Sequence, residues 1–172
     1  ITTRISAVQA SDVEEEFGNK VKYVLDGGKC SIGIESTIIN LVGKPKILRL
    51  GGLDPSKIEK VLGFKINSNI NPKIKTAPGQ SRLHYSPGIP LKMNAIKPKN
   101  EEAFILIKKR KTKLKNYFYI SKENNLNQAA KNLYTCLRKI KKKGYKSIAV
   151  EKIPNRGLGK TINDRLNRAS KF

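Results

Sequence analysis

The stretch DGGKCSIGIEST, residues 26–37, leads directly into the apolar, β-branched run IINLV at residues 38–42. Three glycines within seven residues permit positive φ angles and let a ligand approach the backbone closely. The following residues are typical of a buried strand, which we expect over residues 36–42. A glycine-rich turn that brings hydroxyl groups to a strand end predicts a small-ligand site. Spacing alone leaves a plain hairpin turn open as the alternative.

Short regular elements flank this stretch on both sides. Before it, we expect a helix over residues 12–17, with Ser11 as its N-cap in a capping box with Glu14 and Gly18 at its end, and a strand over residues 21–25. After it, we expect a turn at residues 43–45, a strand over residues 46–50 and a short helix from Pro55 to Gly63.

Residues 68–91 interrupt this pattern, because proline, glycine and asparagine recur too often for a long helix. Beyond them we expect strands at residues 103–108, 117–121 and 147–153, a helix at residues 124–143 and a final helix after Gly157. Strands alternating with helices in this order predict a small parallel sheet. The expected fold class is α/β, with units at residues 1–67 and 91–172 joined by a linker loop at residues 68–90.

Charge is distributed unevenly along the 172 residues, whose formal net charge is +23. Residues 1–67 carry a net +2, residues 68–91 a net +3 and residues 92–172 a net +18. A basic unit of this kind indicates either contact with RNA or another polyanion, or a general bias toward lysine on solvated faces. Aromatic residues are not interleaved with the lysine runs, so both interpretations stay open.

The absence of targeting segments and the spacing of the two cysteines predict the cellular compartment of the protein and the redox state of its thiols. Residues 1–16 contain no apolar signal-peptide core, and no apolar run reaches the roughly 18 residues that a membrane span needs. Cys30 and Cys136 fit no metal-ligand spacing and no disulfide framework. We therefore expect a cytoplasmic protein with no membrane association, in which Cys30 is a packed apolar residue rather than a nucleophile.

Four ordered motifs carry a resemblance to a known family. They are DGGxCxxGIEST at residues 26–37, LRxGG at 48–52, PGxxxxHYxP at 78–87, and GLG followed by DRL within residues 157–166. Together they resemble the two-domain threonylcarbamoyl-AMP synthases, the long form of the YrdC-like family, over essentially the whole chain. The chain departs from the usual family pattern at Leu50, Gln80 and Ser86.

The resemblance implies a fold and an activity. The fold would be the C-terminal part of a YrdC-like catalytic domain, a linker that acts as a lid, and a small Rossmann-like domain with a mainly parallel sheet. The family joins L-threonine, bicarbonate and ATP into threonylcarbamoyl-AMP and releases pyrophosphate, with Mg²⁺ accompanying ATP. The product serves threonylcarbamoyladenosine modification of tRNA, so the downstream tRNA-modification machinery is an implied partner.

The resemblance also implies site residues. Ser36 would contact L-threonine, and its hydroxyl can donate and accept at once; a hydroxyl bonded to its own turn is the structural alternative. Arg49 would bind ATP, because a guanidinium fork suits phosphate; a surface ion pair is the alternative. Ser6 and Tyr85 are the other implied ATP contacts, the tyrosine ring covering apolar surface while its hydroxyl finds a polar partner.

Neighbouring residues would support these contacts. His84, the single histidine of the chain, belongs to the lid loop. Glu35 could be a metal ligand or a general base, but a carboxylate beside ATP would repel phosphate, so we expect a supporting role. No catalytic nucleophile and no protein metal ligand are expected, since the chemistry needs positioning and charge neutralisation.

Activity of these 172 residues alone is not expected. The Lys-x-Arg and Ser-x-Asn motifs of the family's N-terminal half do not precede residue 26 here, so we interpret the chain as an N-terminally truncated, inactive fragment in which residues 1–67 are poorly stable. Two other hypotheses remain, a basic module that binds double-stranded RNA without catalysis and a purely structural α/β interaction domain.

Overall fold

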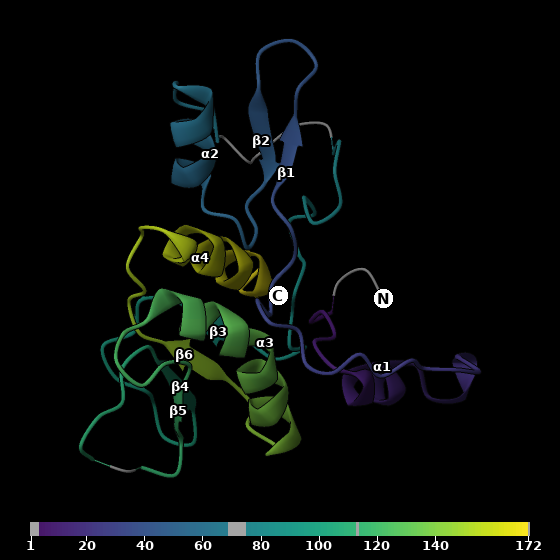
Figure 1. Ribbon diagram of the computed structural model, residues 1–172. Helices are drawn as coiled ribbons and strands as arrows, with labels where there is room; N and C mark the ends of the chain where they lie inside the picture. Colours follow the sequence, from purple (N-terminus) through teal and green to yellow (C-terminus); the bar gives the residue numbers. More distant parts are fainter. Residues whose placement is uncertain (1–3, 69–74, 113, 172) are drawn as a thin grey trace.

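The computed structural model describes residues 4–68, 75–112 and 114–171 (Figure 1). A small lobe, residues 36–68 with β1, β2 and α2, lies above a larger body that holds the other strands and helices α3 and α4. The elements in chain order are α1 (Ala10–Phe17), a 3₁₀ turn (Gly18–Lys20), β1 (Ile38–Asn40), β2 (Lys46–Arg49), α2 (Pro55–Leu62), β3 (Leu91–Lys92), β4 (Ala103–Leu106), β5 (Tyr117–Tyr119), α3 (Leu126–Lys142), β6 (Ile148–Val150) and α4 (Leu158–Ala169).

The C-terminal body is built on a parallel sheet with the strand order β3-β6-β4-β5. β6 pairs in parallel with β3 and with β4, and β4 pairs in parallel with β5. Helix α3 connects β5 to β6, as a parallel crossover requires. This mixed α/β arrangement with a mainly parallel sheet confirms the predicted fold class.

Two apolar clusters cover the two faces of this sheet. The main cluster joins Ile105 of β4 to the buried faces of α3 and α4, and it includes Leu133, Leu137, Ile162 and Leu166. A smaller cluster of Phe104, Leu106 and Ala149 lies on the other face, because successive strand residues point to opposite sides. The helical spacing in α3 therefore predicted its buried face correctly.

The small lobe has a much smaller core. β1 and β2 form an antiparallel pair, and α2 packs beside them through Ile58 against a cluster of only Ile47, Leu50 and Ile66. Helix α2 begins at Pro55 after Asp54, whose side chain accepts a hydrogen bond from the Ser56 amide. It ends before Gly63 in the left-handed conformation, as the sequence predicted.

Five expectations about local structure were wrong. The buried strand expected over residues 36–42 is only Ile38–Asn40 and half-buried, and Leu41 and Val42 beyond it are exposed. Residues 21–25 form no strand, and Tyr23 and Leu25 are 75% and 96% exposed, because no described segment offers them a pairing partner. Ser11 does not cap α1; Gln9 is its N-cap, and the carboxylate of Asp12 binds the Val8 amide instead.

The other two wrong expectations concern a strand and a cysteine. β3 was missed, because two residues next to Pro90 carry almost no periodicity. Cys30 is exposed rather than packed, while Cys136 is buried, and burial raises the pKa of the Cys136 thiol to about 12.

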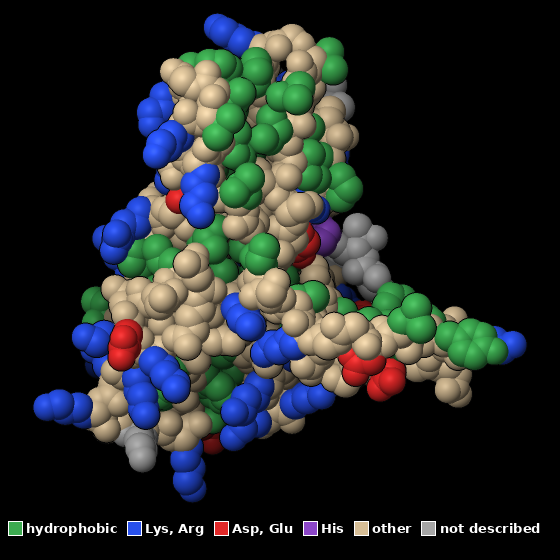
Figure 2. All heavy atoms as spheres, viewed as in Figure 1, with side chains coloured by type: hydrophobic (Ala, Val, Ile, Leu, Met, Phe, Trp, Pro, Cys, Tyr) green, Lys and Arg blue, Asp and Glu red, His purple; other side chains and the backbone are tan. Residues whose placement is uncertain are grey.

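Large apolar side chains gather on the surface of the small lobe, as Figure 2 shows over its upper part. Leu41, Val42 and Val61 are 69%, 86% and 86% exposed. In the C-terminal body the exposed large apolar residues are only Ile96 and Leu114 among those described. An apolar surface of this kind indicates a face that another segment or protein covers.

Candidate functional site

The arginine predicted after β2 lies directly against the serine predicted before β1. The guanidinium of Arg49 donates through Nε to the Ser36 carbonyl at 3.1 Å and through Nη2 to the Ser36 hydroxyl at 3.1 Å. Gly51 permits this approach, because a Cβ atom there would lie 2.2 Å from the Ser36 carbonyl carbon. The antiparallel pairing of Ile38 with Arg49 therefore brings the two candidate ligands together.

The linker loop closes over this pair. Arg49 Nη1 donates to the Pro78 carbonyl at 3.4 Å, and the Cδ of Arg49 lies 3.0 Å from the position of a Cβ on Gly79. The Tyr85 hydroxyl lies 2.3 Å from that same position. Arg49 and Tyr85 thus meet at Gly79, and Ser36 joins them through its contact with Arg49; their roles as ligands stay predictions.

Tyr85 has an unusual conformation. Its φ angle is +59°, a region that bulky residues rarely occupy, and its side chain is 1% exposed. Its hydroxyl is buried without a hydrogen-bond partner among the described residues. Burial raises the pKa of Tyr85, although the nearby positive charge of Arg165 acts in the opposite direction. Strain and an unsatisfied buried hydroxyl together are typical of a functional position.

Polar anchors hold the rest of the loop. Gln80 accepts hydrogen bonds from the amides of Thr76 and Ala77 and donates to the Leu48 carbonyl of β2 at 2.9 Å. His84 accepts from the Tyr85 amide through Nδ1 at 3.0 Å, and its ring lies 4.0 Å from the Tyr85 ring. Burial is the largest reason that the pKa of His84 is lowered.

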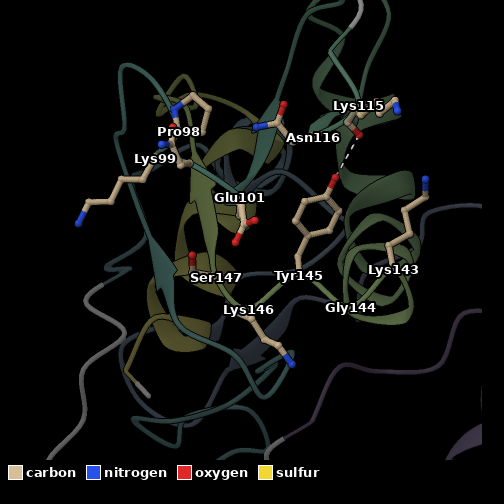
Figure 3. Close-up of a pocket in the computed structure, with 11 residues that line it drawn as sticks. Pro98, Lys99, Glu101, Lys115, Asn116, Lys143, Gly144, Tyr145, Lys146 and Ser147 are labelled. Carbon is tan, nitrogen blue, oxygen red and sulfur yellow. Dashed lines mark hydrogen bonds between the residues drawn. The ribbon is translucent and has the colours of Figure 1, made fainter.

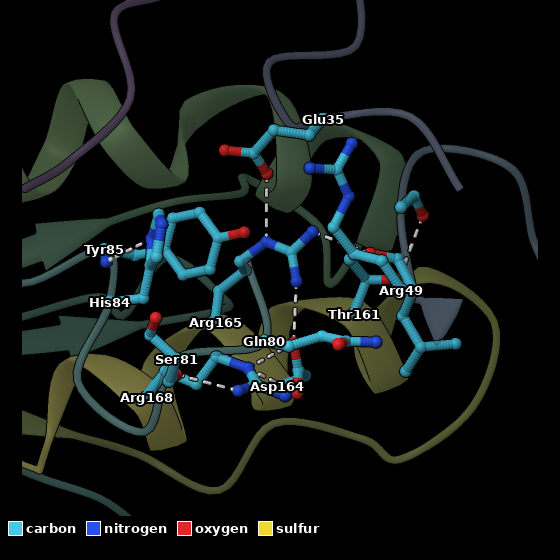
Figure 4. A network of polar contacts seen from close by, with 12 residues as sticks. Glu35, Arg49, Gln80, Ser81, His84, Tyr85, Thr161, Asp164, Arg165 and Arg168 are labelled. Atoms are coloured by element: carbon cyan, nitrogen blue, oxygen red, sulfur yellow. Dashed lines mark hydrogen bonds and ion pairs between the residues drawn. The ribbon is translucent and has the colours of Figure 1, made fainter. Parts of the chain in front are cut away.

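A second polar group, centred on Glu35, lies next to Ser36. Ser6 donates its hydroxyl to Glu35 Oε1 at 2.5 Å, and the Tyr134 hydroxyl lies 3.0 and 3.1 Å from the two carboxylate oxygens. Arg165 Nε lies 3.0 Å from Oε2 (Figure 4). Glu35 thus joins α3 and α4 to the segment that carries Ser36, and its supporting role in the site stays a prediction.

The charges in this group reinforce one another. Burial acts to raise the pKa of Glu35, but the charge of Arg165 and the Ser6 hydroxyl outweigh it, so this pKa lies below its ordinary value. Burial acts to lower the pKa of Arg165, yet its anionic and phenolic neighbours raise it overall. Burial also raises the pKa of Tyr134 well above its usual range. At neutral pH the group therefore holds an ionised carboxylate and guanidinium with neutral phenols.

Sequence reasoning missed Arg165, Tyr134 and Thr161 as residues beside the site. Thr161 of α4 donates its hydroxyl to the Gly51 carbonyl at 3.0 Å, two residues beyond Arg49 in the small lobe. The DRL motif was the available signal for Arg165, but sequence alone gave no reason for a contact 130 residues away. Tyr134 carried no signal beyond its place on the buried face of α3.

A separate hollow lies at the amino-terminal edge of the parallel sheet (Figure 3). Its volume is about 820 Å³, and the Tyr145 hydroxyl donates to the Lys115 carbonyl across it at 3.2 Å. It is lined by Pro98, Lys99, Asn100, Glu101, Lys115, Asn116, Lys143, Gly144, Tyr145, Lys146 and Ser147. Four lysines against one carboxylate make it a cationic hollow, remote in sequence from Ser36 and Arg49.

The described residues contain no group of three or more His, Cys, Asp or Glu side chains that could hold a metal ion. The carboxylate nearest the candidate site, Glu35, is already bound by Ser6, Tyr134 and Arg165. These residues do not fit a protein-held Mg²⁺ site. Among the described residues no helix is both long and apolar enough to cross a bilayer.

The fold and the site define a class of α/β protein. In this class the C-terminal body, built on a parallel sheet, and the linker loop lie against the Ser36 hydroxyl and the Arg49 guanidinium of the small lobe. Comparison with known proteins gives this class a family. Residues 53–171 match the family "Threonylcarbamoyl-AMP synthase, C-terminal domain", and residues 1–51 match the family described as "Telomere recombination". The chain belongs to the threonylcarbamoyl-AMP synthase family.

Relatives and solved structures agree with this assignment. The chain is 30% identical to threonylcarbamoyl-AMP synthase of Pyrococcus abyssi, over 100% of this chain and 56% of that protein. It is 26% identical to the Bacillus subtilis protein of the same name, over 96% of this chain and 53% of that protein. The chain therefore spans about half the length of these relatives.

The structural likeness covers nearly all of the chain. The crystal structure of P. abyssi Sua5 complexed with L-threonine superposes with a TM-score of 0.84 and 28% identity, over 99% of this chain and 55% of that one. A P. abyssi Sua5 variant with adjacent histidine and tyrosine replaced by alanine superposes with a TM-score of 0.80 and 26% identity, over 99% and 54% of the two chains.

Proposed function

We propose that this chain forms the C-terminal half of an L-threonylcarbamoyladenylate synthase, a nucleotidyltransferase that supplies threonylcarbamoyladenosine modification of tRNA. One observation carries the proposal. Arg49 donates two hydrogen bonds to Ser36, next to the loop in which Tyr85 is buried. Hydroxyl, guanidinium and phenol side chains suit an amino acid and a nucleotide held side by side. L-threonine is the bound molecule named for a P. abyssi relative.

In the reaction, the amine of threonine bonds to the bicarbonate carbon with loss of water. An oxygen of the resulting carbamate then attacks the α-phosphorus of ATP, and the bond to the β-phosphate breaks to release pyrophosphate. Ser36 would hold threonine, while Arg49, Ser6 and Tyr85 would orient ATP. These groups position the reactants and offset charge, so no protein nucleophile is needed.

The His84–Tyr85 loop would act as the lid that excludes water from the labile mixed anhydride. Tyr85 is already packed inward, and its strained φ shows that its surroundings hold it there. Mg²⁺ is not assigned to any described side chain, since Glu35 has no free coordination position. Any magnesium of this reaction would depend on ligands outside the described residues.

The site needs a second half of the catalytic domain. The relatives extend well beyond the matched region, and the small lobe exposes the apolar side chains Leu41, Val42 and Val61. If a further catalytic segment covered this surface, burial would stabilise the protein by about 25 cal/mol for each Å² of apolar area removed from water. We therefore propose that activity requires this segment and that the 172 residues alone are inactive.

The test uses the chain joined to the remaining catalytic segment of the family. Pyrophosphate release should require threonine, bicarbonate and ATP together, and Arg49→Gln should abolish most of it. The unjoined chain serves as the matched control and should release none. Release without threonine, or no release from the joined polypeptide when it is folded, would contradict the function.

A second candidate function is contact with an RNA backbone at the cationic hollow of Figure 3. Lys99, Lys115, Lys143 and Lys146 line it, on a unit whose net charge is +18 over residues 92–172. Replacing these four lysines by glutamine should weaken binding of a tRNA probe. It should also make the plot of the logarithm of the binding constant against the logarithm of the salt concentration less steep. The slope should decrease by roughly 0.9 for each phosphate that the protein no longer neutralises. Lys57→Gln with Lys60→Gln on α2 is the control, and an equal effect there would exclude the hollow.

A further inference from the structure

One side chain of the C-terminal domain enters the site formed by the other parts of the chain. Arg165 belongs to α4, is 1% exposed, and directs its guanidinium toward the small lobe and the linker loop (Figure 4). Its Nε contacts Glu35 Oε2 at 3.0 Å, and its Nη2 donates to the Leu50 carbonyl at 2.6 Å. Its Nη1 contacts the Asp164 carboxylate at 2.6 Å.

The two contacts outside α4 fall beside the candidate ligands. Glu35 immediately precedes Ser36, and Leu50 immediately follows Arg49. A planar guanidinium that binds both the Glu35 carboxylate and the Leu50 carbonyl restricts how far these two residues can separate, because its donors stand in a rigid fork. Arg165 thus sets the distance between the Glu35–Ser36 segment and the Arg49–Leu50 segment, which meet in the hydrogen bonds from Arg49 to Ser36.

The same guanidinium also supports the lid. The Cζ of Arg165 lies 4.5 Å from the centre of the Tyr85 ring, within the range of a cation–π contact. On the other side, Tyr85 stacks with Tyr134 of α3 at 6.0 Å between ring centres. The strained Tyr85 backbone is therefore held by two side chains of the C-terminal domain.

We propose that Arg165 is a positioning residue, through which the C-terminal domain sets the spacing of Ser36 and Arg49 and holds Tyr85 in the closed lid. The inference rests on the proposed function, since it names the device that organises the proposed site. Arg165 touches Glu35, Leu50 and Tyr85 but none of the proposed reacting atoms, so it is not a catalytic residue.

Stability alone explains this arrangement poorly. A buried ion pair is often no more stabilising than apolar residues of equal volume, because desolvation offsets most of the Coulomb attraction. Arg165 directs its donors to three partners from two units, where one apolar side chain could fill the same space without specifying any spacing. Specific geometry at the site is what the guanidinium provides.

The matched control is Arg138 of α3. Arg138 also crosses between units, donating to the Ile5 carbonyl at 2.8 Å and lying 3.8 Å from the Asp12 carboxylate. No contact joins it to Glu35, Leu50 or Tyr85 among the described interactions. Arg138→Gln therefore reports the cost of removing an interdomain arginine that contacts neither Glu35 nor Leu50, and its effect on the site is confined to the Ile5–Ser6 segment.

The experiment follows Tyr85 directly in the 172-residue chain. With 3-fluorotyrosine incorporated, ¹⁹F NMR resolves Tyr85 by comparison with Tyr85→Phe. Arg165→Gln should move that resonance to a solvent-exposed position, Arg165→Lys should move it partly, and Arg138→Gln should leave it unchanged. Circular dichroism checks folding, and the lysine variant provides the result if the glutamine variant does not fold.

Kinetics in the joined polypeptide give the second measurement. Arg165→Gln should raise the KM for threonine by about tenfold, as expected when a hydrogen bond that organises the site is removed, while Arg138→Gln changes it less than about twofold. An unmoved Tyr85 resonance in Arg165→Gln, or equal changes in both variants, would overturn the proposal. If the wild-type joined polypeptide is inactive, the proposed function fails, and the ¹⁹F result still decides the role of Arg165.

Discussion

Arg49 contacts Ser36 twice, through the backbone carbonyl and through the hydroxyl, each at 3.1 Å. Ser36 is exposed and Arg49 is half-buried in this chain, so a ligand can reach both. The hydroxyl that accepts from Arg49 still has a proton to donate and a second lone pair. The pair can therefore bind a carboxylate or phosphate without first breaking its own contact.

We expect Ser36 and Arg49 to act as a coupled pair. In the joined polypeptide, Ser36→Ala and Arg49→Lys should each lower the rate of threonine-dependent pyrophosphate release by about tenfold, since each removes one charge-assisted hydrogen bond. The double variant should lose less than the product of the two effects, because the residues share a contact. Strictly multiplicative losses in a double-mutant cycle would show that the two act independently.

Gly79 should be sensitive to a single added methyl group. Its φ angle is +86°, and a Cβ would lie 2.3 Å from the Tyr85 hydroxyl. Gly79→Ala should therefore displace the lid and destabilise it by about 1–3 kcal/mol, measured by hydrogen exchange of residues 76–86.

Gly43 provides the control for backbone strain. Its φ angle is +69°, but nothing lies within 4 Å of an added Cβ. Gly43→Ala should lower the free energy of unfolding by only about 1 kcal/mol, because of backbone strain alone. It should leave the hydrogen exchange of residues 76–86 unchanged. Equal effects of both substitutions on lid exchange would show that crowding of Tyr85 is unimportant.

Local patterns predicted most of the regular structure of this chain. Helical spacing and caps specify α2 and α3 because their determinants lie within one or two turns. The apolar runs at β4, β5 and β6 likewise specified a parallel sheet. The segment 21–25 failed because a strand needs a partner, and β-propensity carries no information about whether one is present.

The site could be predicted only where motifs mark it. Ser36, Arg49, Tyr85 and His84 lie in glycine- or proline-rich motifs, and the structure gathers them in one region. Arg165 reaches Glu35 across 130 residues of sequence, and the DRL motif that contains it gives no indication of that contact. Long-range contacts between charged groups depend on domain packing, which periodicity does not report.

Glu35 should make the stability of the protein sensitive to acid. Its pKa in the folded state lies below the ordinary value of 4.5. Its contribution is therefore fully present above about pH 4.5 and is lost as pH falls further. Glu35→Gln should cost about 3 kcal/mol at pH 7, because it leaves Arg165 with a weakened set of buried partners.

Urea unfolding at pH 7 and at pH 3.5 checks this expectation. The difference between wild type and Glu35→Gln should shrink on acidification. Glu15, an exposed carboxylate paired with Lys142, is the control, and Glu15→Gln should have little effect at either pH. A Glu35→Gln difference that is the same at both pH values would argue against the Glu35–Arg165 ion pair.

His84 should open the lid in a different pH range. Burial lowers its pKa below 6.5, so the folded loop resists protonation. The contribution of neutral His84 to the free energy of unfolding is therefore fully present above about pH 6.5, and it is lost as the pH falls below that value. Corrected for intrinsic rates, hydrogen exchange of residues 76–86 should be faster at pH 5.5 than at pH 7.5.

His84→Asn removes this titration while keeping an acceptor close to the position of Nδ1. The variant should show the same corrected exchange at both pH values. The acid range of Glu35 begins about two pH units lower, so the two effects can be separated in one titration. Retained acid sensitivity between pH 7.5 and pH 5.5 in His84→Asn would assign the opening to another group.

The small lobe should yield to protease before the C-terminal body. Its core consists of Ile47, Leu50 and Ile66, whereas the C-terminal body shares a continuous cluster that spans α3, α4 and the sheet. Local opening is easiest where few apolar contacts must be broken, so the small lobe, residues 36–68, should be cleaved first under dilute protease. Ile47→Ala should quicken that cleavage by roughly tenfold or more, given a cost of at least about 2 kcal/mol for a buried isoleucine. Mass spectrometry of the fragments measures the order of cleavage. Equal resistance of residues 36–68 and 91–171 would mean that contacts with α4, through Thr161 and Arg165, stabilise the lobe as strongly as its own core.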